Sequence, residues 1–150
     1  MDEIDKVLLR LLQNDARIGT EQLASEVGLS VTAAKRRVNR LRQDKTITRE
    51  IAMLDPERVG FSVFTLVFVT LERDRRDIVH NFKQAIRKAP QILQGFYTTG
   101  EADFTLLVAS RSMAEYEAFT QEFFWENPNI KGFKTMVVMD NVKLGFALPV

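Results

Sequence analysis

Residues 20–43 read TEQLASEVGLSVTAAKRRVNRLRQ, and this stretch decides the fold of the N-terminal third of the chain. Its first half has the length of a short helix and ends at Gly28, a residue type that readily takes the left-handed conformation found after helices. Ser30 is a favourable N-cap for a second helix, in which Val38 and Leu41 continue an apolar face. A short helix, a glycine-containing turn and a longer helix together predict a helix-turn-helix.

The longer helix of this motif carries a concentrated positive charge. From residue 35 to residue 49 there are seven basic residues and one acid, whereas residues 61–150 carry ten of each. The seven basic residues are Lys35, Arg36, Arg37, Arg40, Arg42, Lys45 and Arg49. Such a patch, on a chain with a formal net charge of only +1, is typical of a nucleic-acid-binding surface, although a solvated helix face would have the same composition.

In a helix-turn-helix, the second helix lies in the major groove of double-stranded DNA with its N-terminal residues at the base edges. Arginine bonds guanine bidentately, and small methyl groups contact thymine. We therefore expect base contacts from Thr32, Ala33, Arg36 and Arg37. Phosphate contacts are expected from Lys35, Arg40, Arg42, Lys45 and Arg49. The helix N-terminus at Ser30 favours a further phosphate.

The remaining sequence predicts one helix before this motif and a separate domain after it. Residues 2–13 repeat apolar positions at helical spacing and would pack against the motif. Residues 46–54 are rich in β-branched residues and predict a strand. The sequence Asp55-Pro56 interrupts this pattern. We therefore divide the chain into domains of residues 1–54 and 55–150.

The second domain alternates strand and helix patterns. Strands are expected at residues 62–71, 92–99, 103–109 and 133–139, with helices at residues 74–89 and from residue 112 onward. This βαββαβ order closes into a four-stranded antiparallel sheet with both helices on one face, so the fold class is α+β. The first strand is apolar on both alternating faces, although helices cover only one. A second copy of the same sheet would cover the other face, which predicts a homodimer.

The composition excludes several other classes of protein. The chain has no cysteine, and His80 is its only histidine, so no zinc finger, histidine metal site or Ser-His-Asp triad is expected. The scattered glycines form no phosphate-binding loop. We expect neither a cofactor nor enzymatic activity. The acidic start lacks the apolar core of a signal peptide, and the longest apolar stretch is roughly half a membrane span, so the expected location is the cytoplasm.

Motifs in both halves resemble the Lrp/AsnC family of transcription regulators. In the N-terminal half they include Asp15-Ala16-Arg17, Val27-Gly28-Leu29-Ser30 and Arg37-Val38-Asn39-Arg40-Leu41. In the C-terminal half, Thr99-Gly100-Glu101-Ala102-Asp103-Phe104 resembles the family's TG-x-x-D turn. The resemblance implies a winged helix-turn-helix, a β hinge and a ferredoxin-like effector domain. It also implies dimers that assemble further, for example into octamers, with small ligands, usually amino acids, bound between dimers.

Carried over residue by residue, the resemblance places the effector at the turn after the second strand of the second domain. The implied effector-binding residues are Thr98, Thr99, Gly100, Ala102 and Asp103. Asp103 could pair with an ammonium group, and exposed amides at Gly100 could bind a carboxylate. The same residues are also those of an ordinary tight hairpin.

Two functions therefore remain. The first is a sequence-specific DNA-binding transcription regulator that responds to a small ligand, an amino acid. The alternative is an architectural DNA-binding protein that ignores small molecules. An enzyme on the same sheet is opposed by the residue content and would leave residues 1–54 without a purpose.

Overall fold

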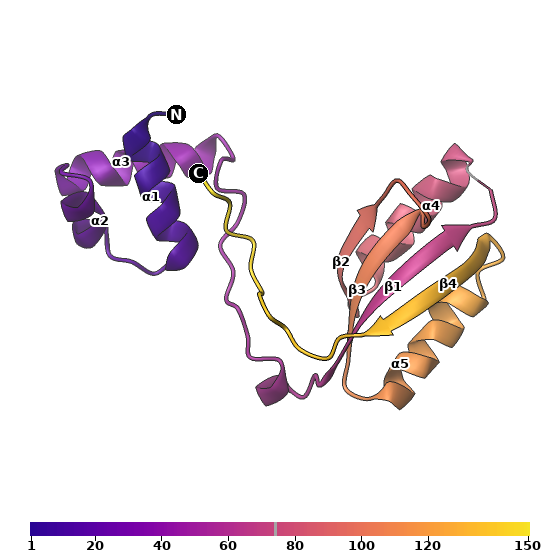
Figure 1. The fold of residues 1–150 in the computed structure, drawn as a ribbon. Helices are drawn as coiled ribbons and strands as arrows, with labels where there is room; N and C mark the ends of the chain where they lie inside the picture. Colours follow the sequence, from indigo (N-terminus) through magenta and orange to yellow (C-terminus); the bar gives the residue numbers. More distant parts are fainter. Residues whose placement is uncertain (74) are drawn as a thin grey trace. The chain divides into compact units, whose positions relative to one another are not determined.

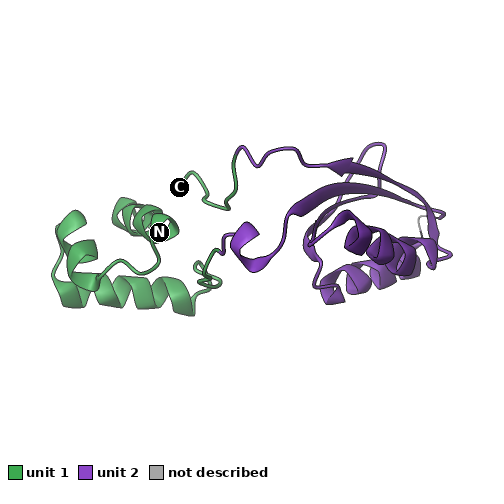
Figure 2. Ribbon diagram, turned by 90° about the horizontal axis from the view of Figure 1, so that it is seen from below, with its two compact units in different colours: residues 1–53, 143–150 green, residues 54–142 purple. Residues whose placement is uncertain are grey.

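The computed structural model describes residues 1–73 and 75–150. The chain divides into two compact units, residues 1–53 with 143–150 and residues 54–142, which Figure 2 shows in separate colours. The sequence interpretation placed residues 143–150 with the second domain, whereas their contacts lie with the first. The expected start of a helix at residue 74 lies outside the described residues.

The first unit contains the helices that the sequence predicts. They are α1 (Glu3–Asn14), α2 (Thr20–Glu26) and α3 (Val31–Gln43). Leu8, Leu23 and Val38, one from each helix, form its buried core. Gly28 has a φ of +65° in the turn between α2 and α3, and the Ser30 side chain accepts a hydrogen bond from the Ala33 N–H at 3.2 Å. The turn and cap that define the motif are therefore confirmed.

The segment after α3 departs from the prediction. Residues 46–54, all of which the structure describes, form no strand, and Ile51, Met53 and Leu54 are exposed. β-branched residues favour a strand only when a neighbouring strand completes its hydrogen bonds, and none of the strands formed by the described residues pairs with the segment. The predicted strand at residues 46–54 is therefore wrong for the single chain, whereas the β hinge that the resemblance implies stays a prediction.

The C-terminal segment of the chain, residues 143–150, belongs to the first unit. The Gln13 side chain of α1 donates to the Leu148 carbonyl at 3.1 Å and accepts from the Leu148 N–H at 2.6 Å. The Arg10 guanidinium donates to the Val150 carbonyl at 2.6 Å. The side-chain amide of Gln13 thus forms with the Leu148 backbone the same pair of hydrogen bonds that a neighbouring strand would form. This contact explains why residues 143–150 belong to the same compact unit as the three helices.

The second unit is a four-stranded antiparallel sheet with order β2-β3-β1-β4 and two helices (Figure 1). Its elements are β1 (Val63–Leu71), α4 (Arg76–Lys88), β2 (Ile92–Tyr97), β3 (Phe104–Ser110), α5 (Met113–Thr120), a π-helical turn η2 (Gln121–Trp125) and β4 (Ile130–Val137), preceded by a 3₁₀ turn η1 (Glu57–Val59). This is the predicted βαββαβ fold with both helices on one side of the sheet (Figure 2).

The core of this unit lies between the sheet and its helices. Central strand β1 pairs with β3 on one edge and β4 on the other. Its residues Val67 and Val69 are fully buried against the helices, where Phe82 of α4 and Phe119 of α5 join the same cluster. The strand's alternate residues lie on the opposite face and are only partly buried. In the part of the chain that the structure describes, no helix is long and apolar enough to cross a membrane.

We predict that replacing Lys45 with glycine stabilises the first unit. Lys45 follows the C-cap Asp44 and has a φ of 64°, in the left-handed region where a side chain is strained. Lys45→Gly should raise the free energy of unfolding by about 1 kcal/mol, measured by urea denaturation. Lys45→Ala removes the same charge but keeps a Cβ, so it should give no comparable gain. Equal stabilisation by both substitutions would contradict the argument.

Candidate nucleic-acid interface and effector-binding turn

Helix α3 presents two distinct faces. Ala34, Val38 and Leu41 are buried against α1 and α2 and fix the rotation of the helix. The opposite face is exposed and lines a shallow depression, formed by Thr32, Lys35, Arg36, Asn39, Arg40 and Gln43. A regular row of cationic and amide side chains on one helix face can reach both phosphates and base edges.

Two of the basic residues of α3 are tied to the start of α1. The Arg37 Nη1 lies 2.7 Å from Asp2 Oδ2 and 2.9 Å from Asp5 Oδ1, and the Arg40 Nη2 lies 2.6 Å from Asp5 Oδ2. Asp5 is only 1% exposed. Asp2 and Asp5 also form a reciprocal capping box, with each side chain accepting the other's backbone N–H. The same two carboxylates therefore cap α1 and hold α3.

The protonation of these groups follows from their contacts. Burial alone would raise the pKa of Asp5, but the Asp2 N–H and the guanidinium groups of Arg37 and Arg40 outweigh it and hold that pKa below its ordinary value. The hydrogen bond from Arg37 likewise lowers the pKa of Asp2, and the bond to Asp2 raises the pKa of Arg37. The lowered pKa of Asp5 favours its charged form, and both guanidinium groups pair with this buried carboxylate.

The expected DNA contacts therefore fall into three groups. Thr32, Lys35 and Arg36 are exposed on the outer face of α3, whereas Ala33 is half-buried. Arg37, with only 24% of its side chain exposed, and Arg40 bond to the carboxylates of α1. Of the remaining four, Ser30 caps α3, Arg42 forms an ion pair with Glu50 at 2.8 Å, and Lys45 and Arg49 are exposed beyond the end of α3.

Two residues on the outer face were missed by the sequence interpretation. Asn39 and Gln43 share the face of Lys35 and Arg36, at helical spacing, and both are exposed. A side-chain amide can donate to and accept from an adenine edge at the same time. A search for positive charge alone overlooks such residues, although their spacing from Lys35 and Arg36 was present in the sequence.

The implied effector-binding residues form a tight connection between β2 and β3. The Thr98 N–H donates to the Asp103 carbonyl at 2.9 Å, and the Thr98 hydroxyl donates to the Ala102 carbonyl at 2.9 Å. Gly100 has a φ of +118°, which favours glycine over residues with a Cβ. Thr99 and Gly100 are exposed, while Thr98, Ala102 and Asp103 are half-buried. The turn brings all five residues together at one end of the sheet.

Asp103 also anchors the turn to the central strand. Its Oδ2 accepts the Leu71 N–H at 2.7 Å, and its own N–H donates to the Val69 carbonyl at 2.9 Å. Both bonds hold the end of β1 against the start of β3. A carboxylate that already accepts a backbone N–H keeps further lone pairs for a ligand's ammonium group.

A helix-turn-helix joined to a βαββαβ domain defines a DNA-binding transcription regulator with a ligand-binding domain. Residues 1–42 match the AsnC-type helix-turn-helix domain, and residues 65–148 match the Lrp/AsnC ligand binding domain. The chain therefore belongs to the Lrp/AsnC family of transcription regulators, whose members are regulators rather than enzymes.

Similar proteins match along the whole length. An uncharacterised HTH-type transcriptional regulator of Sinorhizobium fredii is 49% identical, over 100% of this chain and 89% of the relative. The Bkd operon transcriptional regulator of Pseudomonas aeruginosa is 36% identical, over 99% of this chain and 97% of its own length. A transcriptional regulator of Neisseria meningitidis, solved as a complex with L-Met, is 26% identical with a TM-score of 0.94, over 99% of this chain and 96% of that one.

Proposed function

We propose that this regulator reads DNA with the outer face of α3, and that Arg36 makes the main base contact there. The observation that carries this proposal is the exposed row of Lys35, Arg36 and Asn39, which bonds to no acidic side chain among the described residues. Arg37 has a different role: its bonds to Asp2 and Asp5 hold α3 on α1 and so aim the outer face. Lys35, which forms no ion pair with a described residue, contributes to the dependence of binding on salt.

Alanine substitutions at two adjacent arginines test this division. Arg36→Ala should weaken binding to a specific operator by about tenfold or more, as expected for loss of a bidentate base contact, without lowering the thermal midpoint. Arg37→Ala should lower the thermal midpoint, because it leaves the Asp5 carboxylate with one partner fewer. Binding would be measured by fluorescence anisotropy, and unfolding by circular dichroism. Unchanged operator affinity in Arg36→Ala would refute the assignment.

We further propose that two copies of the second unit pack through the sheet face that the helices leave open. Phe64, Leu66 and Phe68 of β1 lie on this face and are only half-buried. Their neighbours in register include Leu107 of β3 and Met136 of β4, on either side of Leu66. A contiguous apolar surface in the middle of a sheet is typical of an interface, and a second copy offers the same surface. Such dimers would bring two α3 helices to one operator and could assemble further, for example into octamers.

A charge at the centre of this face tests the dimer. Leu66→Glu should convert the protein to a monomer at micromolar concentration, because a dimer would bury two unpaired carboxylates. Sedimentation equilibrium of the two proteins measures the change, and sedimentation velocity of the native protein shows any larger assembly. Glu72→Gln, an exposed change just beyond β1, is the control and should leave the mass unchanged. A native protein that sediments as a monomer would eliminate the proposal.

The effector that we propose for the turn at residues 98–103 is an amino acid. The half-buried Asp103 carboxylate suits an ammonium group, and the exposed backbone at Gly100 suits a carboxylate. The complex of the similar Neisseria meningitidis regulator with L-Met supports this class of ligand. Because Asp103 also holds the Leu71 N–H, a ligand that draws on this carboxylate acts directly on the end of β1.

Thermal denaturation in the presence of single amino acids tests this proposal. Binding to the native state raises the midpoint with ligand concentration, and L-methionine is the first probe. Asp103→Asn should abolish this rise while DNA affinity stays intact, because the asparagine oxygen can still accept the Leu71 N–H but the negative charge is lost. A response that persists in Asp103→Asn would clear this residue of the role. If no amino acid shifts the midpoint, the proposal of an amino-acid effector is refuted.

A further inference from the structure

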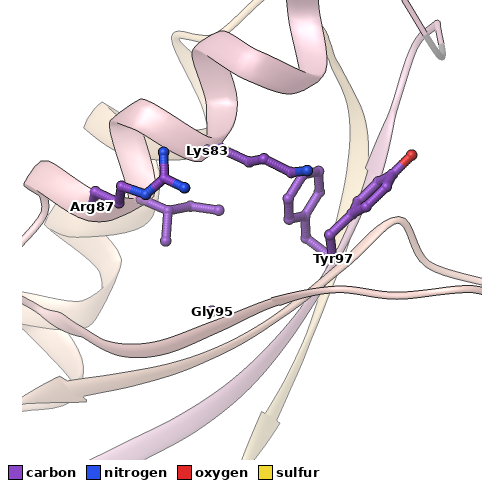
Figure 3. Close-up of a pocket in the computed structure, with 6 residues that line it drawn as sticks. Lys83, Arg87, Gly95 and Tyr97 are labelled. Atoms are coloured by element: carbon purple, nitrogen blue, oxygen red, sulfur yellow. The ribbon is translucent and has the colours of Figure 1, made fainter. Parts of the chain in front are cut away.

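A separate pocket lies between α4 and the edge strand β2. Its volume is about 190 Å³, and it is lined by Lys83, Ile86, Arg87, Gly95, Tyr97 and Phe104 (Figure 3). None of these belongs to the turn at residues 98–103. The volume lies below the roughly 300–1,000 Å³ of pockets for drug-sized ligands, so the pocket suits a small metabolite.

The close approach of helix and strand depends on Gly95. A Cβ added there would lie 2.7 Å from Ile86 Cγ2 and 3.2 Å from Leu106 Cδ2, so any side chain would displace the helix residue above it. Gly95 therefore allows α4 to lie close to β2 at this position and provides a bare backbone floor (Figure 3). Strand β2 lies at the edge of the sheet, where it pairs with β3.

Two cations from consecutive turns of α4 line this pocket. Lys83 and Arg87 are four residues apart on one helix face, and both side chains reach over the strand (Figure 3). The Lys83 ammonium lies 4.4 Å from the centroid of the Tyr97 ring, which holds it over the strand. Neither cation forms an ion pair with another described residue, and no carboxylate is among the described residues that line the pocket. The pocket is thus cationic at one side and apolar at Ile86 and Phe104.

We propose that this pocket binds a small carboxylate that has an apolar body and no ammonium group, such as a 2-oxo acid. Arg87 and Lys83 bind the carboxylate, and the Ile86 and Phe104 side chains contact the hydrocarbon. A zwitterionic amino acid is disfavoured, because its ammonium group would lie close to two cations and would meet no carboxylate among the described residues that line the pocket. The proposal is independent of the effector proposed for residues 98–103, where Asp103 supplies a carboxylate.

Calorimetric titration of the full-length protein with three probes tests this assignment. The probes are 4-methyl-2-oxopentanoate, L-leucine, which has the same carbon skeleton with an ammonium group, and inorganic phosphate. We expect saturable binding of the oxo acid in the millimolar range or tighter. Arg87→Gln should weaken it by about tenfold or more, the usual effect of losing a hydrogen bond to a charged group.

The matched control is Lys88→Gln. Lys88 is the next residue on α4, is exposed and carries the same charge, but it does not line the pocket. This variant should change the affinity for the oxo acid by no more than about twofold. Equal losses in both variants would show a general charge effect and overturn the proposal. So would absence of saturable binding, or Arg87-dependent binding of L-leucine or phosphate as tight as that of the oxo acid.

Discussion

The architecture of the second unit depends on the central strand β1, which carries apolar residues on both faces. It has neighbours on both edges, β3 and β4, so its backbone is satisfied within the sheet. One face carries Val67 and Val69 into the helix-covered core. The other face repeats large apolar residues that the helices do not cover. Large apolar residues on an open sheet face are typical of a surface that another layer covers, which is why we propose a second copy of this unit there. The pattern that motivates this proposal is present in the sequence of a single strand.

In the first unit, charge has two separate uses along one helix. The basic residues of α3 look alike in the sequence, yet the structure divides them by their position around the helix. Arg37 and Arg40 meet the two carboxylates that cap α1, whereas Arg36 points away from α1. The ion pairs of Arg37 and Arg40 with the buried Asp5 fix the orientation of α3. Arg36 forms no ion pair with a described acidic residue, so we propose that it contacts DNA. The number of basic residues between residues 35 and 49 is therefore larger than the number of cationic groups that are free to contact DNA.

The elements that depend on local spacing could be predicted from the sequence. The helix-turn-helix follows from the apolar positions, Gly28 and Ser30, and the βαββαβ order follows from alternation of helical and strand periodicity. The features that depend on partners distant in sequence could not. The contact between Asp5 and Arg37 spans 32 residues. The prediction of a strand at residues 46–54 was wrong because the strand propensity of its residues does not provide a neighbouring strand to pair with. The pocket at Gly95 depends on how α4 packs over β2, and no local sequence pattern determines that packing.

The turn at residues 98–103 and the pocket at Gly95 are adjacent in the chain but opposite in charge. Tyr97 lines the pocket, and Thr98 begins the turn. The turn contains the Asp103 carboxylate, and the pocket contains Lys83 and Arg87. An α-amino acid has both charges, so it suits a site with an anion and exposed amides. A 2-oxo acid has only the negative charge, so it suits the cationic pocket. The two compounds differ by exchange of an ammonium group for a carbonyl oxygen. The charges of the two proposed sites therefore suit binding of the amino acid at the turn and of the oxo acid in the pocket.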